Sequence, residues 1–179
     1  AVIDSPRAYA TGAETAGDAE IWTPKNYGDK VMGKDSLRTA LVKSLNLPTI
    51  GLCEELKPKL VIAYSRRFGI TAEMMENLTT CLGSLSVTLQ EMISAYGVFA
   101  NQGRLVKPIY ILRVEDQDGS ILESSVSELK QVTSEETAFL VSNVLQDVVQ
   151  RGTGRRARAI GRPSAGKTGT TNDSIDAWY

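Results

Sequence analysis

The sequence has 179 residues, 42% of them hydrophobic, and its 20 Lys and Arg residues nearly balance 21 Asp and Glu residues. This is the composition of one ordinary globular domain or part of one, and a formal net charge of −1 gives no indication of nucleic acid or an anionic membrane as a partner. The chain contains no histidine, which excludes Ser-His-Asp hydrolases, zinc-helix proteases and imidazole metal sites within it. Any proton transfer must therefore use lysine, a carboxylate, tyrosine or a hydroxyl relay.

The first half of the chain is predicted to form a loop followed by helices. Residues 1–34 are rich in small and polar residues and are expected to form an extended loop. A short helix is predicted from Ser36, which has the character of a helix cap, to Asn46, with Pro48 closing the segment. Two further helices are predicted over 58–68, which starts at a proline, and over 88–101, which starts at a capping box.

The second half combines a hairpin with one long helix. Apolar and polar residues roughly alternate over 110–115 and resume at 121–122, after an Asp-Gly turn, which predicts a β-hairpin. A capping box from Thr133 to Glu136 predicts the start of an amphipathic helix that ends near Gly152.

The chain then continues through a basic, Gly-rich segment over 151–162, interpreted as a solvated loop. Small and β-branched residues over 164–171 predict a strand, Asn172-Asp173 a turn, and residues 174–179 a second strand. A helix-rich middle and a strand-rich end predict an α+β fold with an incomplete sheet.

The two cysteines, Cys53 and Cys81, have no second cysteine or histidine nearby that would complete a metal site. Both are expected to be small buried apolar residues, with a disulfide as the alternative. The redox compartment is undecided at this point.

Lys167 belongs to three overlapping patterns, the first of which is a P-loop. Residues 161–168, Gly-Arg-Pro-Ser-Ala-Gly-Lys-Thr, match G-x-x-x-x-G-K-[ST]. A P-loop follows a buried strand and opens a helix whose amides hold phosphate. Here arginine-rich residues precede the motif and poor helix formers follow it, which weighs against nucleotide binding. A nucleotide-binding module stays open as an alternative that tight, magnesium-dependent ATP binding would favour.

The second pattern, Ser-x-x-Lys, is the nucleophile signature of serine acyltransferases. It occurs from Ser164 to Lys167 and from Ser127 to Lys130. The chemistry needs both side chains on one face of a helix. Pro163 disfavours a helix at the first match, and the second falls in a polar connector, so we interpret both as chance matches.

The third pattern is Lys167-Thr168-Gly169-Thr170, which contains the Lys-Thr-Gly element of β-lactamases and penicillin-binding proteins. On a strand, Lys167 and Gly169 would point one way, Thr168 and Thr170 the other, and the glycine would let a substrate backbone lie against the edge. A strand edge with a cation fits a peptide that ends in a carboxylate.

The surrounding sequence resembles the transpeptidase domain of class A penicillin-binding proteins. Residues 167–179, Lys-Thr-Gly-Thr-Thr-Asn-Asp-Ser-Ile-Asp-Ala-Trp-Tyr, resemble the extended Lys-Thr-Gly strand and the strand after it. Residues 22–27 resemble the family's Trp-x-Pro-x-Asn-Tyr stretch, residues 36–48 its Ser-x-Asn element, and residues 95–103 another family hallmark. The resemblance implies a partial penicillin-binding-protein/β-lactamase-like fold, in which a helical cluster packs on an incomplete antiparallel sheet.

The resemblance also implies a serine-type D-Ala-D-Ala transpeptidase that cross-links peptidoglycan stem peptides through an acyl-enzyme and is acylated by β-lactam antibiotics. It implies no cofactor, no metal and no nucleic acid. The longer parent would carry a glycosyltransferase domain and a membrane anchor outside this chain, and would act on the outer, periplasmic or extracellular, face of the bacterial cytoplasmic membrane.

Site roles follow by position in the motifs. Lys167 would orient the substrate carboxylate, and the hydroxyls of Thr168 and Thr170 would be candidates to bind it, beside Gly169. The backbone N–H of Thr170 would be one oxyanion-hole donor. In the Ser-x-Asn element, the catalytic candidates are Ser44, which would relay a proton between the active-site lysine and the leaving amine, and Asn46, which would hydrogen-bond the substrate's amide.

The sequence departs from the family pattern in one respect that bears on activity. The family's nucleophilic Ser-x-x-Lys precedes a region that resembles Asp4-Ser5-Pro6, so no nucleophile is assigned here. Residues 1–179 are therefore expected to be an incomplete transpeptidase domain that lacks the nucleophile and the C-terminal strands, and to be inactive alone. A non-catalytic, peptidoglycan-binding relative is the other alternative.

Overall fold

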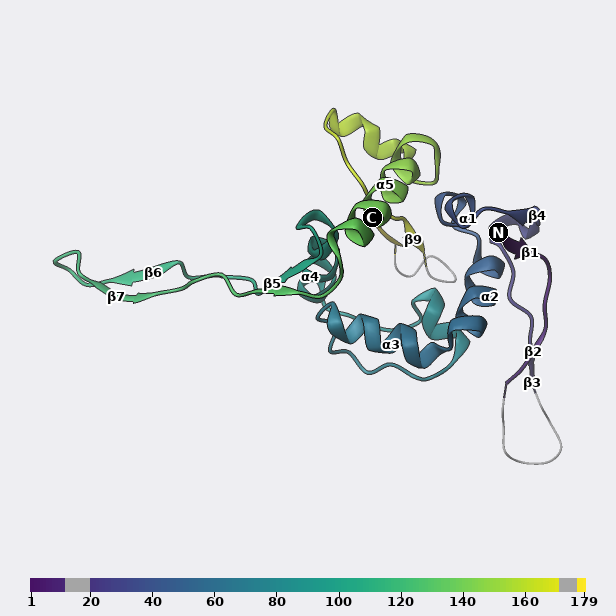
Figure 1. The fold of residues 1–179 in the computed structure, drawn as a ribbon, viewed down its shortest axis with the longest axis horizontal. Helices are drawn as coiled ribbons and strands as arrows, with labels where there is room; N and C mark the ends of the chain where they lie inside the picture. The colour runs from purple at the N-terminus through teal and green to yellow at the C-terminus, as the bar shows by residue number, and fades with distance from the viewer. Residues whose placement is uncertain (12–19, 171–176) are drawn as a thin grey trace. The chain divides into compact units, whose positions relative to one another are not determined.

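The computed structural model describes residues 1–11, 20–170 and 177–179 (Figure 1). The chain divides into two compact units, the first of Ala1–Ile62, Met74–Leu85 and Asn143–Tyr179 and the second of Ala63–Glu73 and Ser86–Ser142. Helices occur with short two-stranded antiparallel sheets in the described residues, so the predicted α+β class is confirmed.

The N-terminal part of the first unit holds short strands. Strand β1 (Val2–Asp4) pairs with β4 (Gly33–Asp35), and β2 (Tyr9–Thr11) pairs with β3 (Glu20–Trp22). A one-turn 3-10 helix, η1 (Tyr27–Asp29), lies between β3 and β4. The prediction of a loop without regular structure is therefore wrong here, because strands of three residues are too short to show an alternating pattern.

Two helices follow where one was predicted. Helix α1 (Leu37–Lys43) begins as expected at Ser36, whose Oγ accepts a hydrogen bond from the Thr39 N–H at 3.0 Å. Helix α2 (Asn46–Leu56) then starts almost at once. The prediction that Pro48 closes the helical segment is wrong. Pro48 is the third residue of α2, in the first turn, where a helix has no hydrogen-bond partner for the N–H that proline lacks.

Helix α5 (Glu135–Arg151) is the long amphipathic helix predicted to end near Gly152. Its cap is one residue later than predicted: the Oγ of Ser134, not that of Thr133, accepts from the Thr137 N–H at 3.2 Å. Both residues can cap a helix, so the local sequence does not choose between them.

Helices α1, α2 and α5 supply most of the core of the first unit. Arg38 of α1 also forms an ion pair with Asp147 of α5 at 2.6 Å, and Arg151 contacts the same carboxylate at 2.7 Å. The buried apolar residues are Ala40, Val42, Leu45, Leu47, Ile50, Cys53, Leu145, Val148 and Val149.

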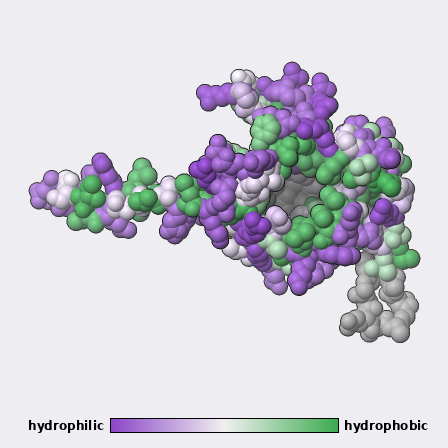
Figure 2. All heavy atoms as spheres, viewed as in Figure 1, coloured by the Kyte–Doolittle hydropathy of each residue, from purple (hydrophilic) through white to green (hydrophobic). Residues whose placement is uncertain are grey.

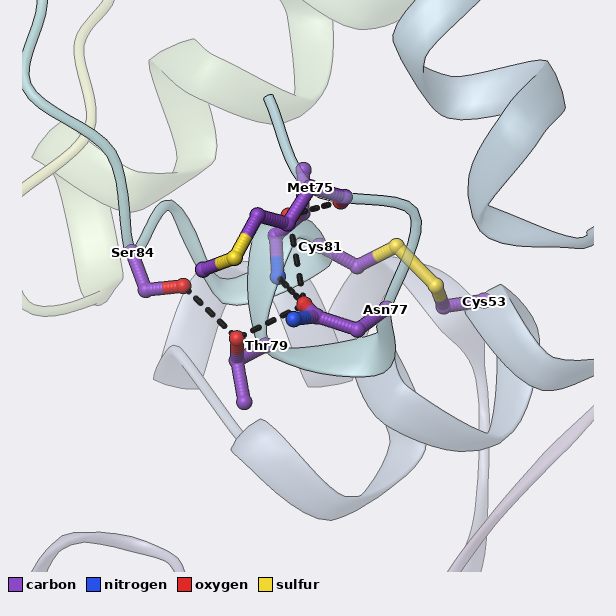
Figure 3. The surroundings of a disulfide bond; sticks show 7 residues. Cys53, Met75, Asn77, Thr79, Cys81 and Ser84 are labelled. Carbon is purple, nitrogen blue, oxygen red and sulfur yellow. Dashed lines mark hydrogen bonds between the residues drawn. A yellow bond between two sulfur atoms is a disulfide. The ribbon is translucent and has the colours of Figure 1, made fainter. Parts of the chain in front are cut away.

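A disulfide joins α2 to the 3-10 helix η2 (Leu78–Leu82) (Figure 3). It links Cys53 and Cys81, whose Cα atoms lie 6.2 Å apart, a separation ordinary for a disulfide. Asn77 caps η2 by accepting from the Thr80 N–H at 3.2 Å. Cys53 is buried as predicted, but the two cysteines are paired, so the disulfide alternative holds.

The second unit contains the predicted helices and hairpin. Helix α3 (Pro58–Arg67) begins at its proline and contributes its last five residues to this unit. Helix α4 (Leu89–Ala100) begins at the predicted capping box between Thr88 and Glu91. Strand β5 (Arg104–Val106) packs beside α4 and pairs with β8 (Leu129–Gln131). The core of this unit consists of Ala95, Val98, Val132 and Ala138.

The hairpin of β6 (Arg113–Glu115) and β7 (Ile121–Ser124) confirms the prediction from alternation and the Asp-Gly turn. Within its unit it extends away from α4 and β5 (Figure 1). Hydrophobic and hydrophilic residues alternate along its surface (Figure 2), where large apolar side chains such as Leu112 and Leu122 are exposed.

The end of the chain differs partly from expectation. The basic segment predicted as a loop contains a 3-10 helix, η3 (Arg155–Ile160). The predicted C-terminal strands are shorter, β9 (Gly169–Thr170) and β10 (Ala177–Trp178), which pair with each other. The turn predicted at 172–173 lies outside the described residues. In the part of the chain that the structure describes, no helix is both long and apolar enough to cross a membrane.

Candidate active site

Two of the predicted site residues, far apart in sequence, meet in the first unit. The Nζ of Lys167 donates a hydrogen bond to the Oγ of Ser44 at 2.6 Å and another to the carbonyl of Thr168 at 2.7 Å. An ammonium group has only donors, so the Ser44 oxygen must accept, and the Ser44 proton is free to point elsewhere.

Ser44 is held in place by the way α1 ends. It adopts the left-handed conformation, with φ 56° and ψ 48°, and its N–H donates to the Leu41 carbonyl at 3.1 Å. The Leu45 N–H donates to the Ala40 carbonyl at 2.9 Å, which completes a helix-ending turn. Glycine is the residue usually found in this conformation, and a side chain there carries strain of about 1 kcal/mol or more. A serine in place of glycine at this position indicates that the hydroxyl, which accepts from Lys167, has a function in the site.

Asn46 is the first residue of α2, and its side chain is turned toward the N-terminal segment. Its Nδ2 donates to the Lys25 carbonyl at 2.8 Å, and its backbone N–H donates to the Oδ1 of Asn26 at 2.8 Å. Among the described residues, no hydrogen bond joins the Asn46 side chain to Ser44 or Lys167. The Oδ1 of Asn46 and the second proton of its amide keep their capacity for a ligand.

Asn26 is a residue of this site that the sequence did not single out. It is 5% exposed, and its Oδ1 accepts from the backbone N–H groups of Asn46 and Leu47, at 2.8 and 3.2 Å, so it caps α2 from a distance. Its Nδ2 donates to the Oδ1 of buried Asp4 at 2.7 Å and to the Lys30 carbonyl at 2.8 Å. The signal in the sequence is its place in the stretch 22–27, which resembles the family's Trp-x-Pro-x-Asn-Tyr stretch.

Lys167 is electrostatically unusual for a lysine. It is half-buried, and burial lowers its pKa below the ordinary value of 10.5, because removal from water disfavours the charged form. No carboxylate among the described residues lies within ion-pair distance of its Nζ. The site therefore presents a partly desolvated cation that an anionic ligand would stabilise.

The residues after Lys167 lead into the strand. Lys167 and Thr168 precede β9, so the predicted alternation of side chains applies only to Gly169 and Thr170. Gly169 is exposed, and a Cβ added there would meet no heavy atom of the described chain within 4 Å. Thr170 is exposed as well, while the Oγ1 of Thr168 lies 2.6 Å from the Oγ1 of Thr153.

The two competing motifs around Lys167 do not fit the structure. A 3-10 helix, η3, precedes residues 161–168 where a P-loop requires a strand, and strand β9 follows where it requires a helix. Ser164 and Lys167 lie in non-helical chain, and Lys130 lies on strand β8, so neither Ser-x-x-Lys match has helical geometry. No group of three or more acidic or cysteine residues in the described part of the chain could hold a metal ion.

Comparison with known proteins shows the class of protein to which the chain belongs. The model of the penicillin binding protein transpeptidase domain matches residues 5–174, and the chain belongs to this family. Penicillin-binding protein 1A of Aquifex aeolicus is 37% identical over 160 residues, which cover 89% of this chain and 22% of that protein.

Solved structures give the same result. The crystal structure of penicillin-binding protein 1A from Haemophilus influenzae matches with a TM-score of 0.89 and 28% identity, covering 99% of this chain and 32% of that one. Penicillin-binding protein 3 from Mycobacterium tuberculosis, complexed with aztreonam, matches with a TM-score of 0.74 and 25% identity, covering 99% and 45%. The chain thus spans about a fifth of the curated relative and a third to a half of these solved chains.

Proposed function

We propose that this chain forms the substrate-binding side of the active site of a serine-type D-Ala-D-Ala transpeptidase, which cross-links peptidoglycan stem peptides through an acyl-enzyme. The observation that carries the proposal is the hydrogen bond from Lys167 to Ser44, between the Lys-Thr-Gly and Ser-x-Asn elements of the family. The nucleophilic serine and its lysine would come from a Ser-x-x-Lys segment outside residues 1–179.

Substrate recognition would use the cation. A stem peptide that ends in D-alanine carries a carboxylate, which Lys167 attracts more strongly than an exposed lysine would because its surroundings are partly desolvated. The hydroxyls of Thr168 and Thr170 would donate to the same carboxylate. The open side of Gly169 would let the peptide backbone lie against β9.

Proton transfer would use Ser44. Lys167 occupies one lone pair of its oxygen and thereby turns the Ser44 proton away from the ammonium group. During acylation the leaving amine needs a proton, which Ser44 would donate while it receives another from the lysine of the Ser-x-x-Lys segment. The Thr170 N–H would stabilise the oxyanion of the tetrahedral state, and the free amide capacity of Asn46 would bind the substrate's amide.

The same geometry supports acylation by β-lactams, which carry a carboxylate and an acyl-transferring carbonyl. The solved structure of penicillin-binding protein 3 from Mycobacterium tuberculosis, which this chain resembles, is a complex with aztreonam. The disulfide between Cys53 and Cys81 supports a location outside the cytoplasm, because cytoplasmic thiols are kept reduced. A location at the outer face of the cytoplasmic membrane follows from the proposed role in peptidoglycan cross-linking.

The test is the intact mass of the full-length protein after incubation with benzylpenicillin, followed by peptide mapping. The proposal predicts one adduct per chain, on a serine outside residues 1–179, and much slower formation in Ser44→Ala. The matched control is Ser84→Ala, because Ser84 is an exposed serine whose hydroxyl donates to the Thr79 hydroxyl in η2. No adduct on folded protein that still binds peptidoglycan would favour a non-catalytic relative, and an adduct within these 179 residues would contradict the site assignment.

A further inference from the structure

A short segment beyond α5 contacts both elements of the proposed site. The hydroxyl of Thr153 lies 2.6 Å from that of Thr168, in the Lys-Thr-Gly element. The backbone N–H of Thr153 donates to the Val42 carbonyl at 3.3 Å, in the last turn of α1 and two residues before Ser44. Local composition predicted only a solvated basic loop, which gives no reason for these contacts.

The backbone around Thr153 is fixed closely enough to aim its side chain. The N–H groups of Gly152 and Gly154 both donate to the Val148 carbonyl at 3.1 Å. A Cβ at Gly152 would overlap the Val42 carbonyl oxygen, and Gly154 is buried, so that a Cβ there would lie 3.1 Å from the Tyr179 ring. Because the two glycines lack a Cβ, the chain at 152–154 can lie close to Val42 and Tyr179, where larger residues would not fit. Thr153, between the two glycines, is thereby held toward Thr168.

The number of protons on the two hydroxyls then limits how they bond. Each hydroxyl has one proton to donate. When Thr168 donates its proton to a substrate carboxylate, the bond between the two threonines persists only if Thr153 is its donor. That donation polarises the Thr168 hydroxyl and strengthens its bond to the anion, as in other chains of hydrogen bonds.

We propose that Thr153 is a positioning residue of the transpeptidase site, which donates to the Thr168 hydroxyl and directs the Thr168 proton to the carboxylate of the substrate or β-lactam. This inference rests on the proposed function and adds to it a residue that acts through Thr168. Thr153 itself touches no reacting atom.

The experiment measures the second-order rate constant of acylation of the full-length protein by benzylpenicillin and by its methyl ester, which lacks the carboxylate. Thr153→Val, which removes the hydroxyl at nearly constant volume, is expected to slow acylation by benzylpenicillin roughly three- to tenfold, the effect of one hydrogen bond. Thr153→Ser should retain most of the rate. Acylation by the ester should change less than about twofold, because the proposed bond acts only on the carboxylate.

A double-mutant cycle and a matched control complete the design. In a Thr168→Val background, Thr153→Val should have no further effect on the rate. The control is Thr137→Val, because Thr137 also pairs with a hydroxyl, that of Ser134 at 3.0 Å, but at the start of α5. It should leave both rates unchanged.

The outcomes separate the inference from the function on which it rests. Equal losses with benzylpenicillin and its ester, or a full effect of Thr153→Val in the Thr168→Val background, would show a merely structural role and overturn the inference. An unchanged rate in Thr153→Val would overturn it as well. If the wild-type protein is not acylated at all, the proposed function fails, and the inference fails with it.

Discussion

Replacement of Asn26 by alanine should destabilise the domain more than any ordinary polar-to-alanine change. The side chain makes four hydrogen bonds, to Asp4, to the Lys30 carbonyl and from the N–H groups of Asn46 and Leu47. Hydrogen bonds contribute roughly 1 kcal/mol each, and unsatisfied buried partners cost about 1–3 kcal/mol, so we expect a loss of about 3–5 kcal/mol in the free energy of unfolding. Among the described residues, Asp4, which is 1% exposed, would keep only its hydrogen bond from the Met32 N–H.

The assay is urea unfolding of the full-length protein at pH 7, followed through the transition of this domain, together with the rate of acylation by benzylpenicillin. Acylation should slow as well, because Asn26 supports the start of α2 next to Ser44. The matched control is Asn77→Ala, since Asn77 also caps a helix, η2, but through local bonds. That change should cost only about 1 kcal/mol.

A variant that adds a negative charge at position 26 gives a second test of the same network. Asn26→Asp keeps an oxygen acceptor for the two N–H groups of α2 but sets a second carboxylate against Asp4, now 2.7 Å from the side chain of residue 26. It should be strongly destabilising at pH 7, because two carboxylates in contact repel each other. The proposed capping network is wrong if the free energy of unfolding of Asn26→Ala lies within about 1 kcal/mol of the wild-type value, or is lowered no more than that of Asn77→Ala.

Three further predictions concern Lys167, Glu91 and the disulfide. The pKa of Lys167 is lowered by burial, so the unfolded state binds more protons between the lowered value and 10.5. The stability of wild type relative to Lys167→Met should therefore rise with pH in that window in urea titrations, and a falling difference would contradict the burial argument. Glu91 has its pKa lowered to about 2, first by the Thr71 hydroxyl, from an ordinary 4.5. Glu91→Gln should accordingly be less stable than wild type at pH 7, and the gap should close as pH falls from 4.5 towards 2; a gap that stays constant would refute this. Replacing both Cys53 and Cys81 by alanine should lower the free energy of unfolding by about 3–4 kcal/mol, from the chain entropy of a loop of 28 residues, and an unchanged urea midpoint would count against the disulfide.

Local signals predicted those elements whose causes are local. Pro58 marks the start of α3, and the box between Thr88 and Glu91 marks the start of α4, because a cap or a proline acts within one turn. The start of α2 was missed for the opposite reason. Its cap, Asn26, lies twenty residues upstream. Local sequence therefore predicts a stop at Pro48, although Pro48 stands in the first turn of α2.

In the candidate site, too, the features with local causes can be predicted and those that depend on tertiary contacts cannot. Motif order allowed Ser44 and Lys167 to be proposed together, although nothing local to either residue indicates the 2.6 Å contact between them. Local sequence gives no indication of the role of Thr153, because the arginines around it dominate the composition. The pairing of Cys53 with Cys81 likewise depends on how α2 packs against η2, which spacing alone does not determine.

The central claim is that Lys167 binds the carboxylate of the ligand, and the rate of acylation of the full-length protein tests it most directly. We expect benzylpenicillin to acylate Lys167→Ala at least tenfold more slowly than wild type, with the exposed Lys59→Ala unchanged, and the methyl ester to react at similar rates with all three proteins. An unchanged benzylpenicillin rate in folded Lys167→Ala would contradict the account, because the lysine–serine pair would then have no part in recognising the substrate.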